Sequence, residues 1–426
     1  QGRTGAASIY LRLMTSDLAL DEIDQYNDRD LVNIGKLVYL AGVYGRRVML
    51  ASATLPPAIA ESFYKAYHAG FQVYRRRVQD DIPLFSGWFA EDARIKKDLE
   101  PSSFADIHKQ WTDDLTKQLD AEEPLRKAEL IETGDPGECA ENTHQIFDAV
   151  WDKAKQLHQR HHVEIQGRRV SIGLARWMNT RMCRAFARYL LDSDFMEKDV
   201  RVVCYHAGHI PAMRYEIERV LDDLLHRARD IPERINSGDD TPGIAALRHA
   251  LQNSESKDLL VIVSATPIED TGRDHDFDWA VWEPNDIRSA PQTAGRVMRH
   301  RPPPTEDLGP NMAILRRNWR SAVQRSETPF SWPGPESEVR AQTDPLKSSG
   351  EKFRVKDYLP STGQGNEDPG DFEAMGPMSR YRQRVDSAAS LSEISFGPLA
   401  DLEHGRLRWL LGPRQDDPAL DGDADE

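Results

Sequence analysis

Short apolar runs that end on small or acidic residues recur along this chain, and amphipathic stretches separate them. In the second half the runs are RRVSIGLA, RVVCYH, DLLVIVSAT and DWAVWE. Strands that alternate with helices favour a parallel sheet, because a helix must return the chain between parallel strands through a right-handed crossover. The sequence therefore predicts an α/β fold.

The same pattern divides the chain into four segments. LMTSDLALDEID and RRVMLASATLPP each resemble a buried parallel strand followed by a loop. We expect one α/β unit over 1–95, linker or edge structure over 96–140, and a second unit over 141–310. Proline and glycine become frequent after Pro302, so 311–426 is expected to hold a linker, an accessory carboxyl-terminal region and an acidic tail.

Charge and cysteine content restrict the class of protein. The formal net charge of -15 argues against a protein that coats nucleic acid without specificity, but it permits local basic patches. Cys139, Cys183 and Cys204 have neither disulfide-framework nor metal-ligand spacing, as expected in a reducing cytosol. No apolar run approaches membrane-spanning length, so we expect a cytoplasmic protein without a membrane partner.

The string ALDEID places Asp21, Glu22 and Asp24 just after an apolar strand. Ligands of open α/β folds bind at the carboxyl edge of the sheet. One acid there could hold Mg²⁺ while its neighbour orients an attacking water, as phosphoryl transfer requires. An acidic loop without chemistry fits these residues equally well.

Two further strings follow apolar runs. SAT occurs at Ser52–Thr54 and again at Ser264–Thr266, where Gly272 and Asp274 continue the loop. Glycine allows the backbone to approach a ligand closely. Asp274 could receive a ribose hydroxyl or a basic partner.

Arg296 and Arg299 are three residues apart, and the pattern predicts a helix that carries Gln292, Gly295, Arg296 and Arg299. Their guanidinium groups can project to one side of such a helix. Arginines can stabilise the charge that develops on a transferred phosphoryl group. The alternative is a surface helix whose arginines pair with acids.

The order of these strings resembles motifs II, III, V and VI of superfamily-two helicases, which implies tandem RecA-like lobes of which the first is partial. Two more strings, SIGLARWMNT (171–180) and VCYHAGH (203–209), sharpen the resemblance. Together the motifs resemble the CRISPR-associated helicase–nuclease that type I Cascade recruits, and DEID and RHR resemble its I-F subtype. The similarity extends from Leu18 to about Pro302.

The resemblance implies an ATP site shared between the lobes. Asp21 would coordinate Mg²⁺, and Glu22 would activate water. Gly272 and Asp274 would border the nucleotide. The residues that contact its phosphates would be Gln292, Arg296 and Arg299.

The resemblance also implies residues for coupling and for DNA. Asp24, Ser52 and Thr54 would link hydrolysis to lobe movement. The residues near single-stranded DNA would be Arg176, Asn179, His206 and Thr266. For His206 and His275 the alternative is a structural role, in which each is a loop histidine whose ring nitrogens are hydrogen-bonded within the protein.

Two elements of the family pattern are absent from this sequence. No GxxxxGK[ST] string supplies the Walker A lysine and the amides that cradle phosphates, and no His plus His-Asp cluster matches a nuclease site. The first residue is not methionine. We therefore expect a chain that lacks an amino-terminal portion with the nuclease domain and Walker A, and a degenerate ATPase is the alternative.

The resulting hypothesis is an ATP-dependent 3′-to-5′ translocase on single-stranded DNA. Its partners would be Cascade and the missing amino-terminal portion, and together they would unwind and degrade target DNA. Two alternatives remain open. One is another superfamily-two enzyme, such as an RNA helicase or a DNA repair translocase, and the other is a non-catalytic binding module.

Overall fold

The computed structural model describes residues 4–336 with short gaps. The gaps are 24–25, 27, 53–54, 56, 91–92, 123, 134–142, 194–198, 228–229, 271, 287–288, 303, 325, 327 and 332–335. Asp24, Thr54, the acidic tail and most of the expected accessory region lie outside the described residues.

The first lobe is built on two parallel strands, β1 (Leu18–Asp21) and β2 (Val48–Ala51), which pair with Asp21 opposite Ala51. Three helices accompany them: α1 (Thr4–Thr15), α2 (Asp28–Val43) and α3 (Pro57–Val78). The two strands therefore end side by side, as the sequence predicts.

Helices α2 and α3 approach each other closely through glycines. A Cβ on Gly42 would lie 2.5 Å from the carbonyl oxygen of Tyr67, and one on Gly70 would lie 2.1 Å from that of Tyr39. Side chains at these positions would force the helices apart. The core between the helices and the strands includes Ile23, Leu31, Val38, Ile59 and Phe63, all buried.

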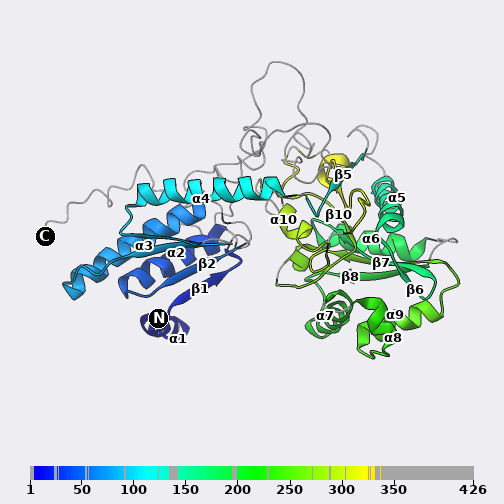
Figure 1. Ribbon diagram of the computed structural model, residues 1–426, viewed down its shortest axis with the longest axis horizontal. Helices are drawn as coiled ribbons and strands as arrows, with labels where there is room; N and C mark the ends of the chain where they lie inside the picture. The colour runs from blue at the N-terminus through cyan, green and yellow to red at the C-terminus, as the bar shows by residue number, and fades with distance from the viewer. Residues whose placement is uncertain are drawn as a thin grey trace, which may run out of the picture.

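A hairpin and a long helix continue the first lobe. Strands β3 (Phe85–Phe89) and β4 (Ala93–Lys97) are antiparallel, and α4 (Pro101–Ala121) follows them. The rings of Tyr64 on α3 and Phe104 on α4 stack at 4.0 Å. In Figure 1, α4 runs alongside α3 and leads towards the second lobe.

The second lobe contains a seven-stranded sheet of order β5-β11-β10-β7-β9-β8, with β6 antiparallel to β7 and the other pairs parallel. Its strands are β5 (Ala128–Ile131), β6 (Val163–Ile165), β7 (Arg168–Arg176), β8 (Asp199–Tyr205), β9 (Asp258–Ala265), β10 (Trp279–Trp282) and β11 (Met312–Leu315). This mostly parallel arrangement confirms the predicted α/β class.

Helices cover both faces of this sheet (Figure 1). On one face lie α7 (Pro211–Leu225), α8 (Ile231–Asn236) and α9 (Pro242–Gln252), and on the other lie α5 (Thr143–His161) and α6 (Thr180–Asp192). The central strand β9 is buried throughout and serves both cores. Leu259, Val261, Val263 and Ala265 pack on the first face, and Leu260 and Ile262 pack on the second.

The second sheet extends beyond the limits expected for its lobe. β5 comes from the segment expected as a linker, and β11 comes from the segment expected as accessory structure. Both strands have four residues, and they pair with each other across more than 180 positions of sequence. Such short apolar runs carry too little periodicity to be recognised as strands.

The segment that carries the two arginines is not a continuous helix, so that prediction is wrong. Helix α10 (Ser289–Ala294) ends before Gly295, and Met298 has a φ of 49°. Val297 instead forms a bridge to Phe277, which draws the segment towards the sheet. Two short elements flank the same edge, η2 (Pro267–Asp270) and α11 (Trp319–Ala322).

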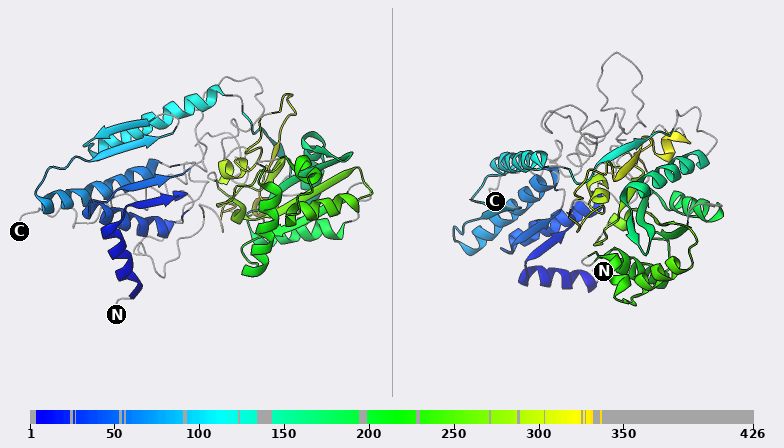
Figure 2. Two further views of the ribbon diagram at one scale, coloured as in Figure 1. Left: turned by 60° about the horizontal axis from the view of Figure 1, so that its bottom comes forward. Right: turned by 45° about the vertical axis from the view of Figure 1, so that its right-hand side comes forward.

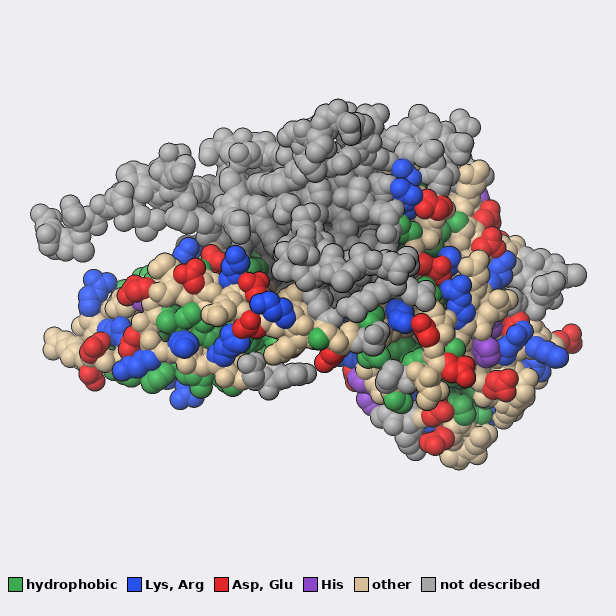
Figure 3. Space-filling model, turned by 45° about the horizontal axis from the view of Figure 1, so that its top comes forward, with side chains coloured by type: hydrophobic (Ala, Val, Ile, Leu, Met, Phe, Trp, Pro, Cys, Tyr) green, Lys and Arg blue, Asp and Glu red, His purple; other side chains and the backbone are tan. Residues whose placement is uncertain are grey.

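The surface mixes charges of both signs. In Figure 3 the lysine, arginine, aspartate and glutamate side chains of the described residues are interspersed on the face that is shown. Within the described part of the chain, no helix combines the length and the apolar character that crossing a membrane requires.

Candidate nucleotide and nucleic-acid site

The acidic residues of the first lobe lie at the carboxyl end of β1. Asp21 is exposed there, and its Oδ1 accepts a hydrogen bond of 3.0 Å from the backbone N–H of Glu22. Glu22 has a φ of 51°, a left-handed conformation that is uncommon for glutamate. Ser52 follows β2 at the same edge. Strained backbone of this kind clusters at functional sites, where surrounding structure holds it.

Glu22 faces the second lobe. Burial lowers the pKa of Arg296 and the nearby Arg299 lowers it further, whereas the negative charges of Glu269, Asp270 and Glu22 act in the opposite direction. Figure 2 shows the carboxyl ends of β1 and β2 directed towards the second lobe. A carboxylate of one lobe and a guanidinium of the other therefore lie close to each other across the space between the sheets.

Arg296 is held by backbone carbonyls of η2. Its Nε donates to the oxygen of Glu269 at 3.2 Å, and its Nη2 donates to that of Asp270 at 2.7 Å. The residue is 3% exposed. Arg296 thus ties the segment after α10 to the loop after β9.

Arg299 is more accessible and pairs with Asp274. Its Nε lies 2.9 Å from Oδ1 of Asp274, which also contacts Nε2 of His300 at 2.8 Å. Partial burial opposes ionisation of Asp274, but the contact with His300 and the nearby positive charges lower its pKa overall. Gly272, with a φ of 61° and open space where a Cβ would stand, begins this loop.

Gln292 has a side-chain nitrogen without a partner. Its Nε2 is buried and makes no hydrogen bond within the described structure. An unsatisfied buried donor costs about 1–3 kcal/mol, so a site that leaves one is suited to an acceptor such as a phosphate oxygen. This observation fits the expected contact between Gln292 and a nucleotide.

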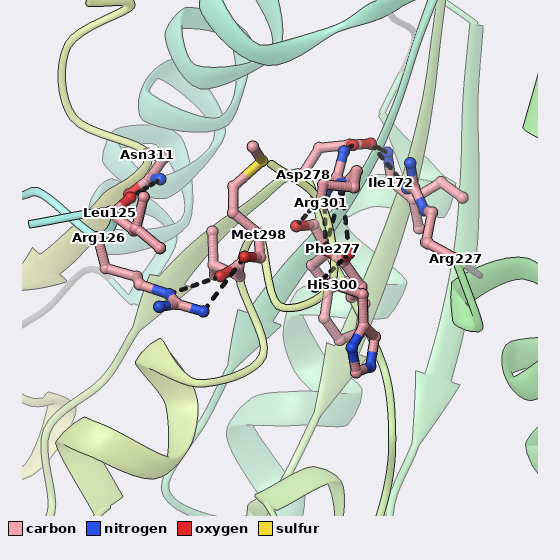
Figure 4. Close-up of polar contacts among 12 residues, drawn as sticks. Leu125, Arg126, Ile172, Arg227, Phe277, Asp278, Met298, His300, Arg301 and Asn311 are labelled. Atoms are coloured by element: carbon pink, nitrogen blue, oxygen red, sulfur yellow. Dashed lines mark hydrogen bonds and ion pairs between the residues drawn. The ribbon is translucent and has the colours of Figure 1, made fainter. Parts of the chain in front are cut away.

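Arg301 stabilises the turn that carries Arg299. It pairs with Asp276 at 2.7 Å and with Asp278 at 2.6 Å, and it donates to the carbonyl of Phe277 at 2.8 Å (Figure 4). Asp278 also pairs with Arg227 and accepts from the backbone N–H of Ile172. Three of the aspartates after the second SAT therefore have two different roles. Asp274 pairs with Arg299, while Asp276 and Asp278 fix the backbone beside it.

Arg126, which precedes β5, fixes the same turn from the other side. Its Nε donates to the carbonyl of Val297 at 2.9 Å and its Nη2 to that of Met298 at 3.2 Å (Figure 4). Neither Arg126 nor Arg301 is predicted from the sequence to belong to the site. The RHR ending was a signal for Arg301, whereas no local pattern marks Arg126.

A second part of the candidate site is an open hollow of about 500 Å³ at the carboxyl edge of β7 and β9. Its lining residues are Met178, Asn179, Thr180, Ala207, Thr266, Pro267 and Ile268. Asn179 caps α6, because its Oδ1 accepts from the N–H of Met182 at 3.0 Å. The start of a helix carries partial positive charge, which favours a phosphate.

Two of the expected DNA contacts are less accessible. His206 is 6% exposed and its ring stacks on that of His209 with centroids 3.9 Å apart. Arg176 is 2% exposed and pairs with Asp270 at 2.6 Å, while its Nη1 donates to Asn285 at 2.5 Å. In this arrangement the guanidinium of Arg176 is buried against Asp270 and Asn285, so it anchors η2, and its contact with DNA stays a prediction.

His275 links the loop after β9 to α7. Its Nδ1 lies 2.5 Å from Glu269, and its Nε2 lies 2.9 Å from Asp222. Burial opposes the charged imidazolium, but the contacts with Glu269 and Asp222 outweigh it and raise the pKa of His275. His275 therefore has a structural position between two carboxylates.

Most of the expected residues gather in groups on each of the two lobes. Asp21, Glu22 and Ser52 lie on the first lobe, while Gly272, Asp274, Gln292, Arg296 and Arg299 lie on the second. Asn179 and Thr266 share the hollow, and His206 is in the turn next to it.

Comparison with known proteins identifies relatives along nearly the whole chain. The family model described as CRISPR-associated nuclease/helicase Cas3, C-terminal, matches residues 169–302. The CRISPR-associated nuclease/helicase Cas3 subtype I-F/YPEST of Pseudomonas aeruginosa is 37% identical over 96% of this chain and 35% of its own length. The protein of the same name from Pectobacterium atrosepticum is 33% identical over 77% of this chain and 30% of its own length.

The chain thus spans about a third of the length of these relatives. Among solved structures, that of T. fusca Cas3 with AMPPNP has a TM-score of 0.47 and 18% identity, and the match covers 74% of this chain and 32% of that one. This likeness is too loose to support an inference about function.

Proposed function

We propose that this chain, which is similar to the CRISPR-associated nuclease/helicase Cas3 of subtype I-F, belongs to that family and forms the motor cleft of such a protein. The cleft would bind ATP between the two lobes, and its hydrolysis would drive movement along single-stranded DNA in the 3′-to-5′ direction. Recruitment by Cascade and degradation of the target belong to the same proposal.

One observation carries this proposal. The charge of Glu22 acts on Arg296, although the two residues belong to different lobes and are separated by more than 270 positions. Opposite charges that face each other across a cleft suit a ligand that needs both a general base and cationic groups. A nucleoside triphosphate with its attacking water is such a ligand.

The residues of the cleft divide the chemistry between them. Glu22 would orient and deprotonate the attacking water. Arg299 would leave Asp274 and stabilise the charge that develops on the γ-phosphoryl group, while Arg296 would keep the segment anchored to η2. Gln292 would donate its free N–H to a phosphate oxygen.

Asp21 is the residue suited to hold Mg²⁺. It is an exposed carboxylate at the end of a parallel strand, next to Glu22, and oxygen ligands are what Mg²⁺ prefers. When bound, the ion would neutralise phosphate charge. Asp21 itself contributes the anionic ligand and, through its contact with the N–H of Glu22, helps to hold the strained backbone there.

The phosphate cradle of a P-loop is not encoded in this sequence. We propose that the cradle is supplied by the part of the relatives' length that this chain does not span. ATP turnover is therefore expected of a longer protein that includes this chain, and not of the chain alone.

The hollow at Asn179 and Thr266 would hold the DNA backbone. It combines the start of α6 with small polar side chains, so it can receive phosphates without reading bases. Asn179, Thr266 and the turn at His206 would shift relative to the first lobe as the cleft closes and opens, which moves the strand.

The proposal can be tested with a chimera in which this chain replaces the aligned third of the Pseudomonas aeruginosa relative. We expect ATP hydrolysis that single-stranded DNA stimulates, and we expect Arg299→Ala to abolish it while DNA binding is retained. Arg188→Ala, at an exposed pair on α6, is the control. Equal turnover in the Arg299→Ala and control chimeras would contradict the motor function and favour a binding module.

A further inference from the structure

The turn after β8 gathers three metal-binding side chains away from the proposed nucleotide cleft. Cys204 is the penultimate residue of β8, and His206 and His209 follow in the turn before α7. One donor atom from each of the three lies within 4.8 Å of the others. The proposed function places the turn at His206 beside the DNA, but neither it nor the family match assigns a metal-binding role to this group.

The side chain of His206 gives a second, independent observation that favours a ligand at this cluster. The residue is 6% exposed, and its Nδ1 is buried without a hydrogen-bond partner within the described structure. A Cβ on Gly208 would lie 3.2 Å from this nitrogen, so glycine leaves the space beside it open. An unpaired buried nitrogen costs free energy that a metal ligand bond would recover.

We propose that Cys204, His206 and His209 form a zinc site with a fourth position open to solvent. One thiolate and two imidazoles are a donor set that Zn²⁺ accepts in tetrahedral geometry. Neighbouring donors around zinc are roughly 3.3–3.8 Å apart, so closing the cluster onto an ion requires shifts of about an ångström. One imidazole must also rotate, because the rings of His206 and His209 are stacked in parallel and an imidazole binds a metal in its ring plane. The Nε2 of His209 contacts the carbonyl oxygen of Cys204 at 2.8 Å, so its Nδ1 is the nitrogen left for zinc.

One nearby charge opposes metal binding. Arg184 is a cation whose charge acts on both Cys204 and His206, so it weakens the attraction for Zn²⁺ and we expect a site of moderate affinity.

The fourth position is assigned to solvent and not to Cys183. Cys183 is fully buried, and its Sγ lies 3.1 Å from the carbonyl oxygen of Ser264, within the core beside β9. It is 3.9 Å from the Sγ of Cys204 but is not part of the group whose donors approach one another. Cys204 and His209, by contrast, are partly exposed.

Bound zinc would stiffen one wall of the hollow. Ala207 lines the hollow and stands between the two histidine ligands in sequence. Fixing both neighbours onto β8 would restrict the turn beside Asn179 and Thr266. The role would be structural, because the hollow does not require the metal for a reaction.

The test measures zinc on the full 426-residue chain after removal of any histidine tag. Competition with a chromophoric chelator should show one Zn²⁺ bound per chain, with moderate affinity. Cys204→Ser and His209→Gln should each weaken binding by about 100-fold or more. His249→Gln, which changes an exposed histidine on α9, and Cys183→Ser should both retain it.

Absence of binding in the unaltered chain would overturn the proposal, and so would loss of binding in Cys183→Ser. A second measurement needs no variant, so it cannot fail because a variant does not fold. It is the absorption spectrum of the unaltered chain with Co²⁺ bound. A thiolate-to-cobalt charge-transfer band is expected, and a cobalt complex without that band would also overturn the assignment of Cys204.

Discussion

Glu22, which follows β1, and Arg296, which follows α10, interact electrostatically between the two lobes: the carboxylate raises the pKa of the guanidinium, against the effect of burial. The strained backbone of Glu22 and the two carbonyl contacts of Arg296 fix both ends of this pair. We propose that this arrangement lets acidic and basic groups from the two lobes approach one ligand.

Asn179→Asp tests the hollow without removing the cap of α6. Aspartate caps a helix as well as asparagine does, so the fold should persist, but the added negative charge should repel the phosphates of DNA. We expect single-stranded DNA to bind this chain roughly tenfold more weakly, as fluorescence anisotropy would measure. Asn253→Asp adds the same charge beyond α9, on the opposite face of the sheet, and should have little effect. Equal binding by both variants would argue against the hollow as the DNA site.

Asp278→Asn tests the network that supports the turn of Arg299. The substitution removes the buried anionic partner of Arg227 and one of the two buried carboxylates that pair with Arg301, so we expect the free energy of unfolding to fall by roughly 3 kcal/mol or more. Urea denaturation would measure it. Asp240→Asn, at an exposed pair with Arg248, is the matched control and should change stability little. A similar small change in both variants would show that the network does not stabilise the lobe.

His275 should make stability depend on pH. Its pKa is raised in the folded chain, so its ion pairs contribute fully below the unfolded value of about 6.5 and are lost as pH rises through the folded value. The free energy of unfolding, measured relative to His275→Gln, should therefore decrease as pH rises from about 6.5. His249→Gln, at an exposed site, should show no such trend. A difference that grows with pH would mean that His275 is neutral in the folded chain.

The strands that the sequence predicts best are those with long apolar runs. β7 and β9 have nine and eight residues, and the burial of β9 on both faces appears in the sequence as DLLVIVSA. β5 and β11 were not predicted, because a run of four apolar residues does not distinguish a strand from other structure. They are strands because they pair with each other, although they lie far apart in the sequence.

The sequence patterns did not predict which side chains of a motif are exposed and which are buried. Arg176 and Asn179 share one motif, yet Asn179 lines the hollow while Arg176 turns inward to Asp270. Likewise the cysteine spacing gave no indication of a metal site, because the histidines that accompany Cys204 belong to a turn whose shape only the fold determines.

The central claim is that Glu22 and Arg299 act on the same triphosphate. The most direct test is DNA-stimulated ATP hydrolysis by the chimera with Glu22→Gln, Arg299→Ala and both together. Arg299→Ala should slow turnover by about 1000-fold and Glu22→Gln by about 100-fold or more. Because the residues would stabilise one transition state, the double variant should be little slower than the slower single variant. Unchanged turnover in either single variant, or losses in the double variant that multiply in full, would contradict the claim.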